Sequence, residues 1–264
     1  MLRPRIIPCL LIHDNGLVKT KNFQNPSYIG DPINAVKIFN EKEVDELIVC
    51  DIDASIQNKT PNLRLIKNFA EEARMPLCYV GGVKTLADVS SIIQLGIEKV
   101  GISSAAFSDL AFIKEAVSLV GSQSIVAVLD IKKNLFGSYG IYINNGTKKI
   151  KKTIIETIDE LQDAGVGEIV INSIDRDGTK TGYDFELIEK IIHHIKVPMT
   201  IIGGVGSFDD FKSAIERYGI IGISAGSLFV YQGRYDAVLI NFLSNEEKNE
   251  LASISTKFYK SHMS

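Results

Sequence analysis

The chain has 264 residues, of which 45% are hydrophobic and 23% charged, and its formal net charge is −3. This length and composition suit one globular domain with a large core. The near-neutral charge gives no reason to expect nucleic-acid or membrane-surface binding, and no apolar run reaches the roughly 18 residues of a membrane span.

The chain begins with basic residues followed by a short apolar run, a pattern that also occurs in signal peptides. Pro8 interrupts the run, and no small-residue cleavage site follows it. We therefore interpret residues 5–12 as a first strand and expect a cytoplasmic protein.

Short apolar runs then alternate with longer amphipathic segments along the whole chain. The runs predicted as strands are 5–12, 46–53, 76–82, 99–106, 125–132, 168–175, 198–204 and 222–229, and the helical segments between them include 31–43, 62–73, 153–165 and 184–195. Eight strand-then-helix units predict an α/β protein with a parallel sheet, and eight strands can close into a (β/α)₈ barrel. An open doubly wound sheet has the same alternation, but no G-x-G-x-x-G follows the first strand.

An internal repeat favours the barrel. The segments 44–49 and 81–83 resemble 166–171 and 203–205 at an offset of 122, and 102–107 is echoed in 223–229. A repeat this long is a half-domain. We predict a single domain over 1–264, made of half-barrels at about 1–122 and 123–240, with a C-terminal helix and tail at about 241–264.

Two glycine pairs end equivalent strands, where the active sites of such barrels form. Glycine lets backbone N–H groups approach an anion closely, and a following helix N-terminus favours negative charge. The alternative is that the glycines only make tight turns. Two related pairs with small partners favour a ligand with a phosphate at each end, bound by Gly82, Ser103 and Ser104 in one half and by Gly204, Gly226 and Ser227 in the other.

The loop 173–179 concentrates charge, a hydroxyl and a turn glycine after the sixth strand, which predicts a ligand-binding loop. We expect Asp177 and Gly178 of this loop to bind phosphate. The alternative is a solvated turn.

A carboxylate also ends the apolar fifth strand, at Asp130. Such a group is costly to bury without a role and suits general acid–base chemistry, although it could instead cap the next segment. Aligning the two halves places Leu11 opposite Asp130, so a reaction that needs two carboxylates would lack one. His13 is two residues further along and should project to the side of Leu11; we interpret it as a loop residue. The three cysteines show no Cys-x-x-Cys spacing, so we expect buried reduced thiols and neither a disulfide framework nor a zinc site. We expect no other metal and no cofactor.

The residues as a whole resemble the HisF family, the cyclase subunit of imidazole glycerol phosphate synthase. The resemblance covers about residues 3–230, and its most specific motif is Ser-Ile-Asp-Arg-Asp-Gly-Thr-Lys at 173–180; further matches are 5–7, Lys19, 22–23, 45–47, the glycine pairs and 121–123.

The resemblance implies a barrel paired with a HisH-like glutaminase, whose ammonia passes through the barrel to a bisphosphate ribonucleotide. It implies an ammonia gate of Arg5, Glu46, Lys99 and Glu168, a substrate loop with Lys19, and a partner interface that includes Glu98. The four gate residues could equally be a structural salt-bridge cluster.

The chain departs from the family's pattern at its chemistry. The family uses two aspartates; Asp130 matches one, and Leu11 stands at the other. Ser103 stands where Asn is usual, and Asn172 where Thr is usual. These changes resemble a paralogous branch linked to surface-polysaccharide biosynthesis, thought to work with a glutaminase and a sugar amidotransferase that makes acetamidino groups.

Three functions follow from the resemblance. The first is a lyase-type, ammonia-using barrel subunit that delivers ammonia for sugar amidation, with its cyclase chemistry impaired by Leu11. The second is a genuine cyclase of histidine biosynthesis. The third is a silent scaffold that regulates the glutaminase.

Overall fold

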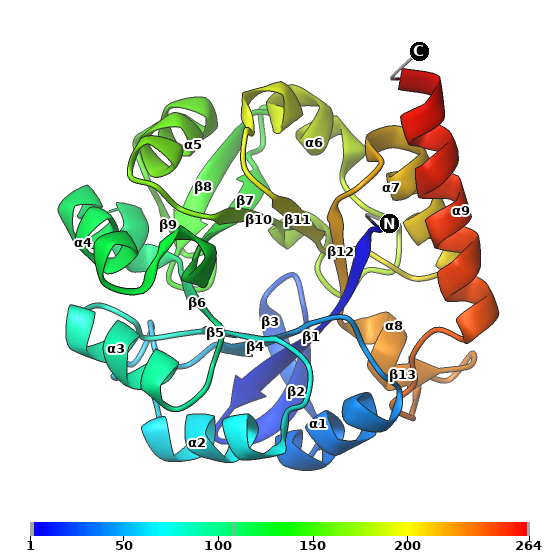
Figure 1. Ribbon diagram of the computed structural model, residues 1–264, viewed down its shortest axis with the longest axis horizontal. Helices are drawn as coiled ribbons and strands as arrows, with labels where there is room; N and C mark the ends of the chain where they lie inside the picture. Colours follow the sequence, from blue (N-terminus) through cyan, green and yellow to red (C-terminus); the bar gives the residue numbers. More distant parts are fainter. Residues whose placement is uncertain (1–2, 108, 263–264) are drawn as a thin grey trace.

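The computed structural model describes residues 3–107 and 109–262. Its central feature is a closed parallel barrel of eight strands in the order β10-β11-β12-β1-β4-β5-β6-β7, which the β7–β10 pairing completes. The strands are β1 Arg5–His13, β4 Leu47–Asp51, β5 Leu77–Val80, β6 Lys99–Ile102, β7 Ile125–Lys133, β10 Glu168–Ser173, β11 Met199–Ile202 and β12 Gly222–Ala225. The barrel prediction is confirmed, and a sheet with this closure is not an open doubly wound one (Figure 1).

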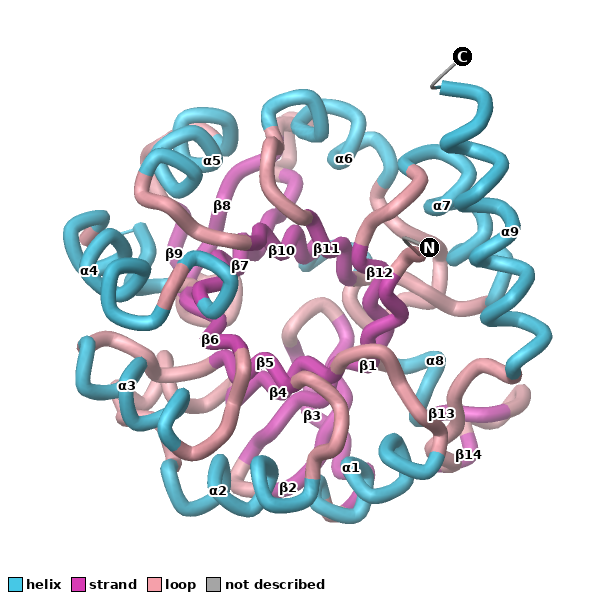
Figure 2. The backbone as a smooth tube through the Cα atoms, in the orientation of Figure 1, coloured by secondary structure: helices cyan, strands magenta, loops and turns pink. Residues whose placement is uncertain are grey.

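Helices surround the strands as an outer ring (Figure 2). They are α1 Pro32–Glu41, α2 Leu63–Glu72, α3 Leu86–Gln94, α4 Leu110–Val120, α5 Ile154–Asp163, α6 Phe185–Ile191, α7 Phe208–Tyr218, α8 Ser227–Val230 and α9 Asn245–His262. Several begin at side chains that satisfy free backbone N–H groups: Thr85 and Thr153 each form a capping box with the acidic residue three positions later. No helix of the described ranges is long and apolar enough to cross a membrane.

Two predicted strands extend too far. The strand predicted over 99–106 ends at Ile102 and continues as the 3₁₀ turn η1 Ser104–Phe107, while the one predicted over 222–229 ends at Ala225 and continues as α8. The predicted helix 184–195 is α6 followed by the 3₁₀ turn η4 Ile192–His194. Apolar composition alone cannot place these boundaries, because a buried strand and a buried short helix share it.

Hairpins that the apolar pattern did not predict follow the first strand of each half. After β1 come β2 Gly16–Lys21 and β3 Gln24–Gly30, and after β7 come β8 Tyr139–Ile143 and β9 Lys148–Lys149. A third small pair, β13 Tyr231–Gln232 and β14 Ala237–Val238, follows α8. The 3₁₀ turns η2 Ser122–Ser124 and η3 Ile174–Arg176 flank β7 and β10. The boundaries proposed for the two half-barrels stay a prediction.

Side chains alternate along each barrel strand between the two layers of the core. On β1, Ile6 and Leu10 pack outward against the helices, whereas Ile7 and Cys9 face a small inner cluster. Val126 and Val128 on β7 and Val170 on β10 belong to the same inner cluster. The barrel interior is therefore an apolar column, with carboxylates and basic side chains at its two ends.

Candidate functional site

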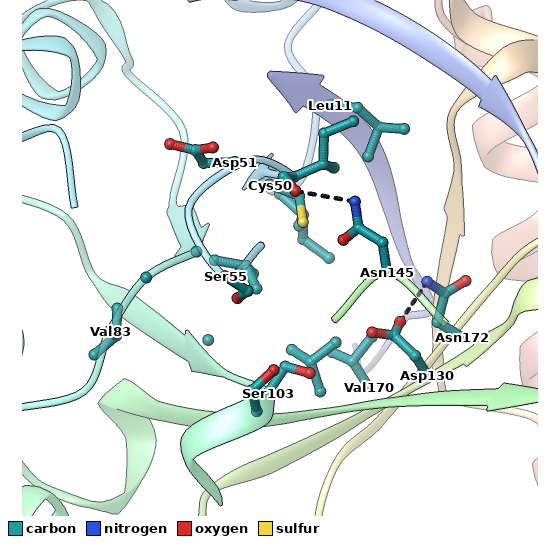
Figure 3. Close-up of a pocket in the computed structure, with 18 of the residues that line it drawn as sticks. Leu11, Cys50, Asp51, Ser55, Val83, Ser103, Asp130, Asn145, Val170 and Asn172 are labelled. Carbon is teal, nitrogen blue, oxygen red and sulfur yellow. Dashed lines mark hydrogen bonds between the residues drawn. The ribbon is translucent and has the colours of Figure 1, made fainter. Parts of the chain in front are cut away.

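A cavity of about 110 Å³ opens at the carboxyl ends of the strands. Apolar side chains of the inner cluster and polar side chains from strand ends and loops line it together (Figure 3). Its lining includes Leu11, Cys50, Asp51, Ser55, Gly82, Ser103, Ser104, Asp130, Asn145 and Asn172. The first predicted anion turn and both symmetry-related central positions therefore share one pocket.

Leu11 and Asp130 occupy equivalent places in the two halves of this pocket. In the first half Leu11 pairs in register with Cys50, and in the second half Asp130 pairs with Asn172. One half thus presents an apolar pair and the other a polar pair. The Asn172 Nδ2 group donates to Asp130 Oδ1 at 2.9 Å.

Burial dominates the electrostatics of Asp130. It raises the pKa of the carboxyl to about 7, because the hydrogen bond from Asn172 compensates only part of the lost hydration and Asp177 adds a repulsive charge. A carboxyl with such a pKa can accept or release a proton near neutral pH, which suits acid–base work.

The first glycine pair is required by close backbone packing. A Cβ on Gly81 would lie 2.8 Å from the backbone oxygen of Asp51, and one on Gly82 would lie 2.8 Å from that of Lys59. Gly82 also has a left-handed φ of +70°. Both glycines are thus explained without a ligand, although Gly82 lines the pocket beside Ser103 and Ser104.

The second glycine pair repeats this arrangement in a neighbouring cavity of about 50 Å³. A Cβ on Gly203 would lie 2.7 Å from the oxygen of Ser173, and one on Gly204 would lie 2.1 Å from that of Gly182. Gly226 and Ser227 line the same cavity, together with Asp177, Gly178 and Lys19.

Lys19 gives this second cavity a buried cation. Its Nζ donates to the backbone oxygen of Cys9 at 2.6 Å, and it is so close to Gly226 that a Cβ there would collide with it. Burial lowers the pKa of Lys19, partly offset by nearby Cys9 and Asp177. A buried ammonium group bonded to a neutral carbonyl favours an anion nearby.

Asp177 was predicted to bind phosphate, but its carboxylate is engaged with the chain itself. It accepts from Thr20 Oγ1 at 2.7 Å and from the backbone N–H of Phe23 at 3.1 Å. A Cβ on Gly178 would overlap the backbone oxygen of Thr20. These two residues therefore fix the β2–β3 hairpin beside the second cavity.

At the opposite end of the barrel, the four predicted gate residues form a closed ring. Arg5 contacts Glu46 at 2.6 Å and Glu168 at 2.7 Å, and Lys99 contacts the same carboxylates at 2.7 and 2.9 Å. Burial alone would raise the pKa of Glu168, but its hydrogen bonds and the charges of Arg5 and Lys99 lower it. Glu98, the predicted interface residue, is exposed next to Lys99 and accepts from the backbone N–H of Leu77.

His13, interpreted from the sequence as a loop residue, is the last residue of β1, and its ring contacts two carboxylates. Its Nδ1 lies 2.7 Å from Asp53 Oδ1, and its Nε2 lies 3.6 Å from Asp14 Oδ2. The strand ends at His13, and Asp14 and Asn15 then turn the chain with left-handed φ angles. In the described ranges, His13, Asp14 and Asp53 form the one group of at least three histidine, cysteine or acidic side chains whose potential metal-ligand atoms all lie within 4.8 Å of one another.

Sequence reasoning missed two residues of the pocket. Asp51 follows an apolar run as Asp130 does, so the same criterion would have found it, although β4 ends at Asp51 and β7 continues past Asp130 to Lys133. Burial raises the pKa of the Asp51 carboxyl, although it accepts hydrogen bonds from the backbone N–H groups of Asp53 and Ala54. Asn145 lies in the β8–β9 turn and donates to the backbone oxygen of Ile52 at 3.0 Å. A contact between residues so far apart in sequence leaves no local signal.

Comparison with known proteins finds similarity to one protein family over most of the chain. The pattern of the family described as "Histidine biosynthesis protein" matches residues 5–236. A protein of Leptospira borgpetersenii bearing the name of imidazole glycerol phosphate synthase subunit HisF is 52% identical over 252 residues, which cover 95% of this chain and 99% of the relative. A Pseudomonas aeruginosa protein named as hisF2 is 49% identical over 242 residues, covering 92% and 96%. The HisF subunit of Helicobacter hepaticus is 38% identical over 231 residues, covering 88% and 91%.

Proposed function

The chain belongs to the HisF group of the histidine biosynthesis protein family, and from this premise we propose that it is the barrel subunit of a heterodimeric glutamine amidotransferase. In this proposal a HisH-like glutaminase docks at the base of the barrel, near Glu98. Its ammonia passes through the barrel and is delivered to a sugar amidotransferase that forms an acetamidino group. The free, largely buried thiols Cys9, Cys50 and Cys78 suit a reducing, cytoplasmic setting.

Leu11 is the observation that favours delivery over cyclisation. It stands opposite Asp130 in the register of the two halves, and it lines the pocket where a second carboxylate would act. A hydrocarbon can neither donate nor accept a proton. Loss of one positioned acid–base group typically costs about 10²–10⁴-fold in rate.

Two features support the passage of ammonia. The ring at the base holds each carboxylate between Arg5 and Lys99, so it closes one end of the barrel with contacts that can exchange partners. Above it, the inner column of Ile7, Cys78, Val126 and Val170 offers neutral walls, which suit neutral ammonia better than ammonium.

The anion-binding features support a phosphorylated ligand. Lys19 is a buried cation beside Gly226 and Ser227, and Ser103 and Ser104 line the other end of the site. The same features favour a second candidate function, a genuine cyclase of histidine biosynthesis. Asp130 also favours the cyclase, because it can serve as one of the two carboxylates. Leu11 favours delivery, because it leaves the second carboxylate of the cyclase missing. A silent scaffold would need neither end of the site.

Cyclase assays separate the candidates. The purified chain is supplied with the family's bisphosphate ribonucleotide and excess ammonium chloride, and formation of imidazole glycerol phosphate is followed. We expect turnover at least about 10²-fold below that of a HisF with both aspartates. A comparable rate would reject the proposal in favour of the cyclase. Delivery is tested in the glutaminase complex: ¹⁵N from the glutamine amide should reach the product undiluted by unlabelled ammonium, whereas a scaffold would give fully diluted label.

A further inference from the structure

Asp130 is a buried carboxylate without a basic partner. Its hydrogen-bond partner is the neutral amide of Asn172, and no ion pair joins it to a lysine, arginine or histidine in the part of the chain that the structure describes. The nearby lysine of the second cavity, Lys19, is bonded to the oxygen of Cys9 instead. An ionised carboxylate in such a place is stabilised by a cation from outside the chain.

Asn145 presents a second oxygen to the same space. Its Nδ2 is used by the bond to the oxygen of Ile52, so its carbonyl end is left to face the pocket, as Figure 3 shows. Its backbone is held in the left-handed region with φ of 51°, next to Asn144 with φ of 53°. The turn thus fixes the amide over the mouth of the barrel, on the side opposite the apolar column.

The other polar side chains that line this pocket do not pair with the carboxylate. Lys84 donates to Asn58 Oδ1 instead, and the hydroxyls of Ser55, Ser103 and Ser104 are neutral. Leu11, Val128 and Val170 are hydrocarbon, and burial raises the pKa of the Cys50 thiol well above its usual value, so it stays neutral. A ligand that satisfies this space must be small, must carry hydrogen-bond donors, and must be positive when it meets the carboxylate. Ammonium meets all three conditions.

We propose that Asp130 and Asn145 form an ammonium-binding site at the mouth of the barrel. The identity of the ligand rests on the proposed function, because the column below the site would supply ammonia. Neutral ammonia that reaches a protonated Asp130 takes the carboxyl proton, which leaves an ammonium ion paired with the carboxylate and changes no other bond. The site holds the nitrogen until its acceptor is in place.

The raised pKa of Asp130 supports this exchange, since its carboxyl keeps a proton near neutral pH that it can pass to ammonia. The ionisable groups that interact with it are Asp177 and the thiols of Cys9 and Cys50, while Asn172 is its neutral partner. Asp51 and Lys84 line the same pocket, but Asp51 is itself acidic and Lys84 donates to Asn58.

The chain alone tests the site. We would titrate it at pH 8 and constant ionic strength with ammonium chloride or potassium chloride, and follow the side-chain amide NMR signals of Asn145 and Asn172. Because a potassium ion has no hydrogen-bond donors, we expect ammonium to bind about tenfold more tightly. Asp130→Asn and Asn145→Gly should each weaken ammonium binding by at least about tenfold. Asn25→Gly is the matched control, since Asn25 is exposed and also has a left-handed φ, of 52°.

Equal affinity for potassium and ammonium, no saturable shift, or full affinity in Asp130→Asn would each overturn the site. The ¹⁵N transfer experiment in the glutaminase complex keeps the two proposals apart. Undiluted transfer without ammonium binding by the chain would reject the site and leave the delivery function standing. Diluted transfer with ammonium binding intact would reject delivery alone.

Discussion

Leu11 and Asp130 are related by the internal symmetry of the barrel, and each pairs at the mouth with a residue of the following strand, Cys50 or Asn172. The pocket therefore has an apolar half and a polar half. Acid–base chemistry across the pocket needs ionisable groups on both sides, whereas holding and passing on a small nitrogen needs only one.

Leu11→Asp should restore the missing carboxylate. If the pocket otherwise suits the cyclase substrate, turnover in the ribonucleotide assay should rise by about 10²-fold or more, because a second acid–base group then faces Asp130. Leu11→Asn is the control, since it has the polarity and size without the charge. An equal gain in both variants would mean that polarity, not proton transfer, limits the rate.

Both glycine pairs should be needed for stability without any ligand. Gly204→Ala places a Cβ 2.1 Å from the oxygen of Gly182 at a φ of +99°, so backbone must move; we expect a loss of about 3 kcal/mol or more in the free energy of unfolding. Gly233→Ala isolates the cost of the backbone angle, because it has a φ of +74° and nothing within 4 Å; it should lose only about 1 kcal/mol. Chemical denaturation measures both. Similar losses would show that the overlap is relieved at no cost.

The barrel, its repeat and the Leu11–Asp130 correspondence could be predicted from sequence because each leaves a local pattern. The alternation of apolar runs with amphipathic segments reflects the closed parallel sheet. Gly81 and Gly203, 122 residues apart in the repeat, are equivalent because each lies too close to the backbone of the last residue of the preceding strand to carry a Cβ. Asn145 could not be predicted, since its place over the pocket depends on a hairpin and a contact with Ile52 from another loop. The bonds of Asp177 to Thr20 and Phe23 could not be predicted either, since those residues are far from it in sequence, and its phosphate-binding role stays a prediction.

Glu46→Gln should loosen the base of the barrel. The substitution removes the charge that Arg5 and Lys99 share, and Glu168 alone would then face both cations. Because Arg5 is partly exposed, we expect a loss of about 1–3 kcal/mol in the free energy of unfolding, less than for a fully buried pair. In the glutaminase complex, the ¹⁵N content of the product should fall, because unlabelled ammonium from the bulk solution can then enter. Asp45→Asn is the control outside the ring, since Asp45 pairs with the exposed Arg3. Stability loss without dilution would assign the ring a structural role only.

His13 should titrate above its ordinary range. The hydrogen bond and charge of Asp53, with smaller contributions from Asp14 and Asp51, raise its pKa. Because the pKa of His13 is raised in the folded chain, its ion pair with Asp53 stabilises the β1–β2 turn fully at a pH below the unfolded pKa. This stabilisation is lost as the pH rises through the folded pKa. NMR titration of the ring should show the pKa fall in Asp53→Asn and fall less in Asp14→Asn. A pKa of His13 that is the same in all three proteins would disprove the His13–Asp53 ion pair.

Ammonium binding should depend on pH through Asp130. Burial raises the pKa of this carboxyl to about 7, so it is largely protonated at pH 6 and ionised at pH 8. Since the ionised form attracts ammonium, affinity should rise about tenfold for each pH unit below that pKa and level off above it. By the same linkage, saturating ammonium should lower the pKa of Asp130. Asp130→Asn should bind weakly at every pH, and the NMR titration repeated between pH 5.5 and 8.5 measures both. A flat profile in the unsubstituted chain would remove Asp130 from the site, because the affinity would then not follow the ionisation of its carboxyl.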